Sequence, residues 1–168
     1  MKRFFLLLFS GTFFSLWPLF FQSAVASEFR AMVLEVIDGD TIKIRDQDQV
    51  LRVRLQGIDA PERDQPFGLE ATNYLVARVE GKLISIFSGG YDRYGRLLGK
   101  IMLNGEDINL HLVQRGYAWW YRYYREQQSL VDQQTYELAE KDAKSLKLGL
   151  WSDPGSINPY EWRKKRGK

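Results

Sequence analysis

Apolar and polar residues alternate between residues 29 and 56 with the period of two that is typical of half-buried strands. The alternation is clearest in residues 41–45 and 51–55, and Asp-Gly and Asp-Gln pairs suited to turns separate these stretches. We therefore predict an antiparallel meander in this part of the chain. The same alternation returns in residues 82–87 and 95–103, which predicts two further strands.

Helical spacing interrupts the strands once and then follows them. Leu75 and Val79 lie on the apolar face of a predicted helix over residues 68–81, and the closing glycine is placed to end it. We expect a short helix over 108–115 and a longer one over 127–146. Five short strands with about three helices favour a mainly β chain of the α+β class, a small closed barrel, over a βαβ sheet.

The N-terminus has the form of a secretory signal. Lys2 and Arg3 precede an uncharged, mostly apolar run over residues 4–21, and Ala24 and Ala26 supply the small side chains of a cleavage site. We expect residues 1–26 to be removed and the protein to be exported to the periplasm or the medium. The alternative is an uncleaved membrane anchor, because the run approaches the roughly 18–20 residues that span a bilayer.

Composition limits the chemistry of the remaining chain. The 168 residues include no Cys and one His, so thiolate zinc sites, cysteine nucleophiles and multi-histidine metal sites are excluded, and we expect His111 to be structural. Lys and Arg number 24 against 21 Asp and Glu. Loss of residues 1–26 takes two of the basic residues, so the mature chain is almost neutral and its net charge does not identify a partner.

Two segments each keep two interpretations. The folded domain that we outline over residues 27–153 precedes a basic tail, residues 154–168, which is either a frayed terminus or a segment attracted to phosphates. Aromatic and Arg residues interleave over 119–125. We expect Trp119 or Trp120 to pack in the core, whereas the remaining rings with their arginines suit a platform on which bases stack.

Three short motifs hold the candidate chemistry. The first motif, Asp38-Gly39-Asp40-Thr41, is on its own typical of a structural turn. The second motif, residues 54–62, contains Asp59, and the carboxylates of Asp40 and Asp59 are both hard oxygen donors. Proline at 61 favours an extended Ala60, whose carbonyl is then directed outward beside Asp59. Two carboxylates, a carbonyl and waters are the donor set that suits Ca²⁺.

The third motif, Tyr91-Asp92-Arg93-Tyr94-Gly95-Arg96, is a predicted turn between strands. On its own such a turn is usually an exposed loop. A planar guanidinium matches phosphate oxygens, however, and Arg96 with Arg54 could hold a phosphodiester from two sides of a metal site.

Taken together and in this order, the three motifs resemble those of the staphylococcal nuclease (thermonuclease) family from about Arg30 to Trp151. The resemblance implies a five-stranded OB-fold barrel and a Ca²⁺-dependent endonuclease that cleaves DNA and RNA and leaves 3′-phosphates. We expect low sequence specificity, since no element offers a helix with base-reading side chains for the major groove. We also expect a monomer without a stable protein partner. The resemblance also implies calcium ligation by Asp40, Asp59 and the Ala60 carbonyl, an outer-sphere role for Asp38, catalysis by Arg54, Glu62 and Arg96, and substrate binding by Arg93, Tyr94 and Tyr124.

The chain departs from the best-known member at three places. Ala60 and Arg93 stand where that member has threonine and lysine, and its base-stacking tyrosines have no certain equivalents within residues 119–125. Two other functions fit parts of the pattern. A noncatalytic OB-type module would bind single-stranded nucleic acid, and a secreted structural protein would use Asp40 and Asp59 as a calcium turn. The second leaves the two arginines and Glu62 without a joint purpose.

Overall fold

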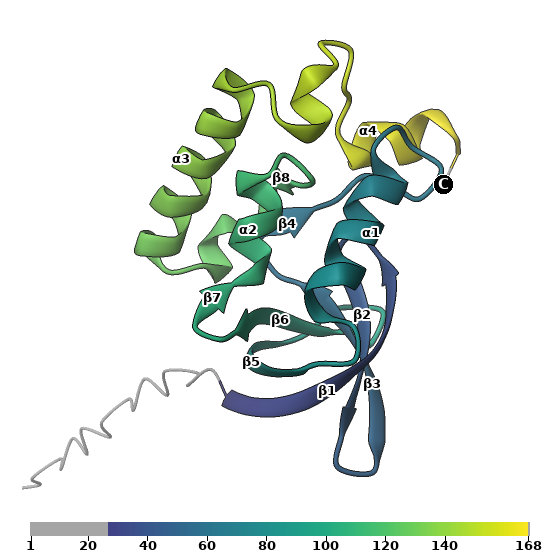
Figure 1. The fold of residues 1–168 in the computed structure, drawn as a ribbon, viewed down its shortest axis with the longest axis vertical. Coiled ribbons are helices and arrows are strands. Elements are labelled where there is room, and N and C mark those ends of the chain that lie inside the picture. The colour runs from purple at the N-terminus through teal and green to yellow at the C-terminus, as the bar shows by residue number, and fades with distance from the viewer. Residues whose placement is uncertain (1–26, 168) are drawn as a thin grey trace, which may run out of the picture.

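The structure is a computed structural model that describes residues 27–167 (Figure 1). Its body is a closed barrel of the five expected strands, β1 Ser27–Asp38, β2 Thr41–Asp46, β3 Gln49–Leu55, β5 Leu83–Tyr91 and β6 Leu97–Leu103. The long strand β1 pairs antiparallel with β2 through one half and with β5 through the other. Parallel pairing of β3 with β6, with Val53 opposite Leu97, closes the barrel. The OB-fold prediction is confirmed.

The barrel interior is filled by the apolar positions of the alternating pattern. These side chains are buried because successive residues of a strand face opposite sides of the sheet. They include Val33, Ile42, Ile44, Val53, Leu55, Ile84, Ile86 and Ile101. Helices cover the end of this core with a second set of buried residues, Ala71, Leu75, Val79, Ile108, Leu112 and Val113.

The helices gather at one end of the barrel (Figure 1). They are α1 Gly68–Val79, α2 Ile108–Gln114, α3 Leu130–Ser145 and α4 Pro159–Lys165, with 3-10 turns η1 Arg122–Gln127 and η2 Gly149–Ser152. Three two-residue strands complete the described chain, β4 Ile58–Asp59, β7 Glu106–Asp107 and β8 Trp119–Trp120. Strands β4 and β8 pair with each other outside the barrel, so Asp59 lies opposite Trp119.

Two expectations about the helices need correction. The third helix begins at Leu130 and not at residue 127, because the Ser129 side chain accepts a hydrogen bond from the Asp132 N–H and so caps it there. The prediction of a frayed C-terminus, one of two for the basic tail, is wrong for Pro159–Lys165. These residues form α4, with Asn158 as its cap. Proline at the first helical position favours this start, because its fixed φ matches the helix.

The described residues, 27–167, contain no helix that is long and apolar enough to cross a membrane. The predicted signal peptide or anchor, residues 1–26, lies outside this part of the chain.

Candidate active site

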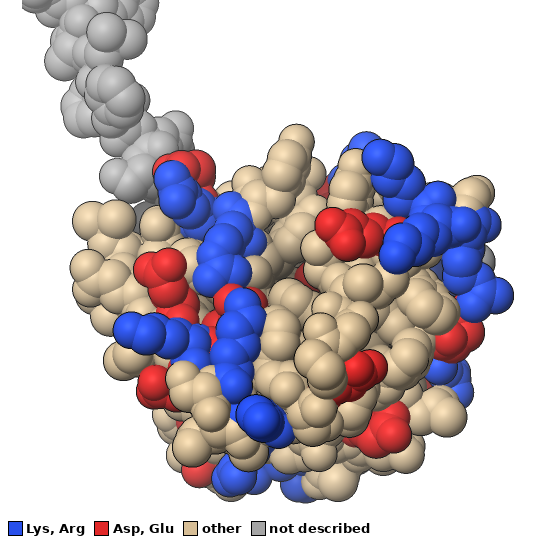
Figure 2. All heavy atoms as spheres, turned by 90° about the horizontal axis from the view of Figure 1, so that it is seen from above, with Lys and Arg blue, Asp and Glu red and all other residues tan. Residues whose placement is uncertain are grey.

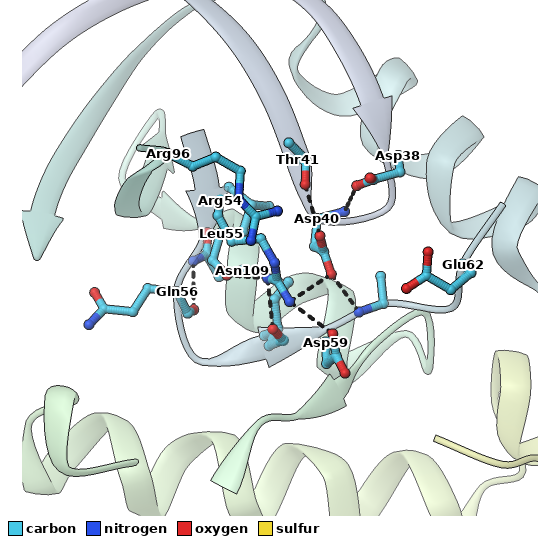
Figure 3. A network of polar contacts seen from close by, with 12 residues as sticks. Asp38, Asp40, Thr41, Arg54, Leu55, Gln56, Asp59, Glu62, Arg96 and Asn109 are labelled. Carbon is cyan, nitrogen blue, oxygen red and sulfur yellow. Dashed lines mark hydrogen bonds and ion pairs between the residues drawn. The ribbon is translucent and has the colours of Figure 1, made fainter. Parts of the chain in front are cut away.

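Arg54 stands at the centre of the site, at the end of β3. One nitrogen, Nη2, lies 2.9 Å from Oδ1 of Asp59 and 3.0 Å from Oδ2 of Asp40, so the two carboxylates converge on one point (Figure 3). The other nitrogen, Nη1, donates to the carbonyls of Leu55 and Ile58 at 2.7 and 2.9 Å. These bonds hold the guanidinium in a fixed orientation beside both predicted metal ligands.

The turn between β1 and β2 delivers Asp40 to this point. A Cβ on Gly39 would lie 2.7 Å from the Cβ of Ala60, so only glycine allows the turn to approach so closely. At this approach the Ala60 N–H donates to Oδ2 of Asp40 at 2.8 Å. The Asp38 side chain accepts from the Asp40 N–H at 3.0 Å and closes the turn (Figure 3). The motif is thus both a structural turn and the support of a buried carboxylate.

The three aspartates crowd together in a poorly hydrated place. Burial raises the pKa of Asp59 to about 6 against the opposing charge of Arg54, and the nearby Asp40 raises it further. Burial, and again the charge of Asp40, raises the pKa of Asp38 to about 6. The three carboxylates outnumber the two guanidinium groups that pair with them, Arg54 and Arg163, so a divalent cation would lower the energy of this arrangement.

Glu62 follows the buried Ala60 and Pro61, on the loop that leads into α1. Its N–H donates to the side chain of Gln65 at 3.1 Å, and its carbonyl accepts from the Gln65 N–H at 2.9 Å. The side chain is half-buried and turned toward the side on which the aspartates lie (Figure 3). Glu62 is therefore close to the carboxylate pair while its loop is held by its own hydrogen bonds.

Arg96 lies at the seam that closes the barrel, where β6 begins beside β3. Because Val53 lies opposite Leu97 in the parallel β3–β6 pair, Arg54 and Arg96 both stand on the outer face of this seam. Asp92 accepts from the Arg96 N–H and from its Nε at 2.9 and 2.8 Å, which fixes the turn. In the same turn the guanidinium of Arg93 lies 4.8 Å from the ring centroid of Tyr94.

The aromatic segment divides between core and surface. Trp120 is buried, as expected for one of the two tryptophans, and its indole N–H donates to Gln128 at 2.8 Å. Tyr124 is exposed and packs edge-on against Tyr121. Burial, and after it the charge of Asp59, raises the pKa of the Tyr121 hydroxyl. Within residues 27–167, Tyr124 makes no hydrogen bond or ion pair with the aspartates.

Three polar residues that matter to the site were not among the predicted site residues. Asn109 is fully buried on α2 and donates to the carbonyls of Gln56 and Gly99, so it holds the loop between Arg54 and Asp59 (Figure 3). Glu140 of α3 is buried beside β8. Arg163 of α4 forms ion pairs with Glu62 and Asp59. The predicted structural residue His111 is half-buried on α2.

Charge on the surface is mixed. Figure 2 shows Lys and Arg in separate groups with Asp and Glu beside them, and not as one continuous basic face. The last turn of α4 contributes Arg163, Lys164 and Lys165. Attraction of a polyanion to this face would therefore be local.

Comparison with known proteins agrees with this geometry. The family model described as "Staphylococcal nuclease homologue" matches residues 52–153. The chain belongs to this family. It is 40% identical over 147 residues to a protein of Shigella flexneri named "Micrococcal nuclease", covering 82% of each chain. It is 33% identical over 151 residues to an "Uncharacterized endonuclease" of Escherichia coli O157:H7, covering 89% of this chain and 92% of that one. The family predicted from the three motifs is confirmed.

Proposed function

We propose that the protein is a Ca²⁺-dependent endonuclease that hydrolyses phosphodiester bonds in DNA and RNA with low sequence specificity. The convergence of Asp40 and Asp59 on Arg54, with Glu62 beside them, carries the proposal. The family and the names of its relatives support a nuclease. The proposal includes low specificity because we identify no helix with base-reading side chains for the major groove among residues 27–167.

The donor set fits calcium. Asp40 and Asp59 offer hard carboxylate oxygens, and crowding of negative charge favours a divalent cation over Arg54 alone. No group of three His, Cys, Asp or Glu side chains suited to a metal occurs within residues 27–167, so backbone carbonyl oxygen, with Ala60 as the candidate, and water would complete the shell. Bound calcium would polarise a non-bridging oxygen of the phosphate.

The residues around the proposed calcium site would each have a separate role in the hydrolysis. Glu62 orients or deprotonates the attacking water, whose oxygen bonds to phosphorus as the bond to the 5′ oxygen breaks and a 3′-phosphate is left. Arg54 and Arg96 stabilise the charge that develops on the phosphoryl oxygens, and Arg96 also assists the leaving oxygen. Arg93 and Tyr94 would hold a neighbouring phosphate, and Tyr124 would stack on a base.

Incubation of the mature protein with plasmid and with single-stranded DNA and RNA tests this function. Cleavage that needs added calcium, stops with chelator and returns when calcium is restored is the expected result. Binding of single strands without cleavage under any of these conditions would instead identify a noncatalytic OB-type module. We also propose that the protein works outside the cytoplasm, since residues 1–26 have the form of a signal peptide. That it acts as a monomer is a separate part of the proposal.

A further inference from the structure

The last helix of the chain is docked on the loop that carries Glu62. Five side-chain contacts tie residues 157–166 to residues 59–65: Arg163 with Glu62 and with Asp59, Gln65 with the Ile157 carbonyl at 2.7 Å, Trp162 with Asp64 at 3.3 Å, and Arg166 with Asp64 at 2.9 Å. Figure 1 shows α4 beside the segment that leads into α1. Because three of these contacts do not involve Arg163, α4 has a support of its own.

Arg163 uses this position to reach the reacting groups. Its Nη1 lies 2.6 Å from Oε1 of Glu62, and its Nη2 lies 3.3 Å from Oδ2 of Asp59. The shorter contact is to Glu62, whereas Asp59 already receives Arg54 on its other oxygen at 2.9 Å. The contact with Glu62 is therefore the principal one, and it holds a single oxygen of that carboxylate.

We propose that Arg163 is a positioning residue for Glu62, which makes the C-terminal helix part of the active site. This inference rests on the proposed nuclease function. A half-buried glutamate on a loop has several accessible rotamers, and a water must be oriented within a fraction of an ångström to attack phosphorus. By holding Oε1, Arg163 fixes the direction of Oε2 toward the water without touching the substrate itself.

Single-turnover cleavage and binding of one oligonucleotide in saturating calcium test the proposal. Arg163→Ala should lower the cleavage rate by about 10–100-fold, because misplacement of a reacting group by about 1 Å has an effect of this size. Affinity for the oligonucleotide should stay within about threefold of wild type. Arg163→Lys, a point charge without the planar fork, should recover part of the rate.

Arg166→Ala is the matched control. It removes an arginine at the C-terminal end of α4 together with an ion pair to the same loop, but this pair is made with Asp64 and not with Glu62. Its cleavage rate should stay within about twofold of wild type, on the scale of surface substitutions. A rate loss equal to that of Arg163→Ala would show that docking of α4 alone matters, and would overturn the positioning role.

A double-mutant cycle with Glu62→Gln separates action through Glu62 from an independent effect. If Arg163 acts through Glu62, Arg163→Ala should slow a protein that already carries Glu62→Gln by less than about threefold. Fully additive rate losses in the double variant would overturn the inference. A cleavage rate of Arg163→Ala above that of wild type would also overturn it, because Arg163 would then be inhibitory. Arg163→Gln gives the same comparison if the alanine variant loses helical signal in circular dichroism. Absence of cleavage by the wild type would overturn the proposed function itself and the inference with it.

Discussion

The backbone N–H of Trp120 donates to Oε1 of Glu140 at 3.1 Å, and this bond fastens strand β8 to helix α3. Strand β8 in turn pairs with β4, where Asp59 lies. Arg122 and Lys144 both reach Oε2 of the buried Glu140, at 2.8 and 2.9 Å. One carboxylate on α3 thus supports the strand pair that presents Asp59 to the site.

Glu140→Gln should lower the free energy of unfolding at pH 7 by about 1–2 kcal/mol. The amide oxygen can still accept from Trp120, but both charge-assisted bonds are lost. Urea unfolding followed by circular dichroism measures the change. Glu137→Gln, an exposed position on the same helix, is the control and should stay within about 0.5 kcal/mol of wild type.

The same pair of proteins gives a pH test. Burial raises the pKa of Glu140, but the bonds from Arg122 and Lys144 outweigh burial and hold it below the ordinary value of 4.5. A carboxyl with a lowered pKa in the folded state stabilises the protein above the pKa of the unfolded state, and this contribution disappears as pH falls through the folded value. The difference between wild type and Glu140→Gln should therefore shrink below about pH 4.5. A difference that stays constant down to pH 3 would contradict this account.

Asp40→Ala should weaken calcium binding and cleavage together. The carboxylate is one of two that converge at the site, so its loss should reduce calcium affinity by at least about tenfold, or ~1.4 kcal/mol. Calcium titration by calorimetry measures the affinity. Asp40→Asn keeps the acceptor for the Ala60 N–H and so separates loss of charge from collapse of the turn, while exposed Asp48→Ala is the control. Equal calcium affinity in wild type and both Asp40 variants would remove Asp40 from the ligands.

Glu62→Gln should lower the rate of cleavage by roughly 10²–10⁴-fold, which is the contribution of a general base, with little change in affinity for nucleic acid. The amide keeps the size of the side chain and its acceptor for Arg163. Single-turnover cleavage and equilibrium binding on one oligonucleotide distinguish chemistry from binding. An unchanged rate would exclude Glu62 from the reaction, whereas Arg96→Ala should lose both rate and some affinity for phosphate.

The exported protein should begin at Ser27. In the structure Ser27 is also the first residue of β1 and pairs with Ser88 of β5, so cleavage after Ala26 would leave the barrel complete. N-terminal sequencing of exported material checks the position. Ala26→Phe should block processing, because the cleavage site requires small side chains. A chain that keeps Met1 in the membrane fraction would instead identify residues 1–26 as an anchor.

Local patterns in the sequence were sufficient for most of the barrel and for part of the site. Alternation of apolar residues reports which face of a strand is buried, and so the strands around Ile42, Val53 and Ile86 could be predicted. The motifs at Asp40 and Asp59 could be recognised because each places its chemistry within a few residues of a turn or a strand end. Periodicity indicates the local backbone conformation and which side chains are buried. It does not indicate which elements contact one another.

Only the tertiary structure decided how distant residues meet. Arg163 and Glu62 are separated by 101 positions, and Asn109 and Gln56 by 53. Such pairs form because packing of the helices on the barrel brings them together, and no repeat or spacing in the chain marks them in advance. For the same reason the sequence of the basic C-terminal segment allowed two local interpretations. In the folded chain Arg163 of this segment forms an ion pair with Glu62.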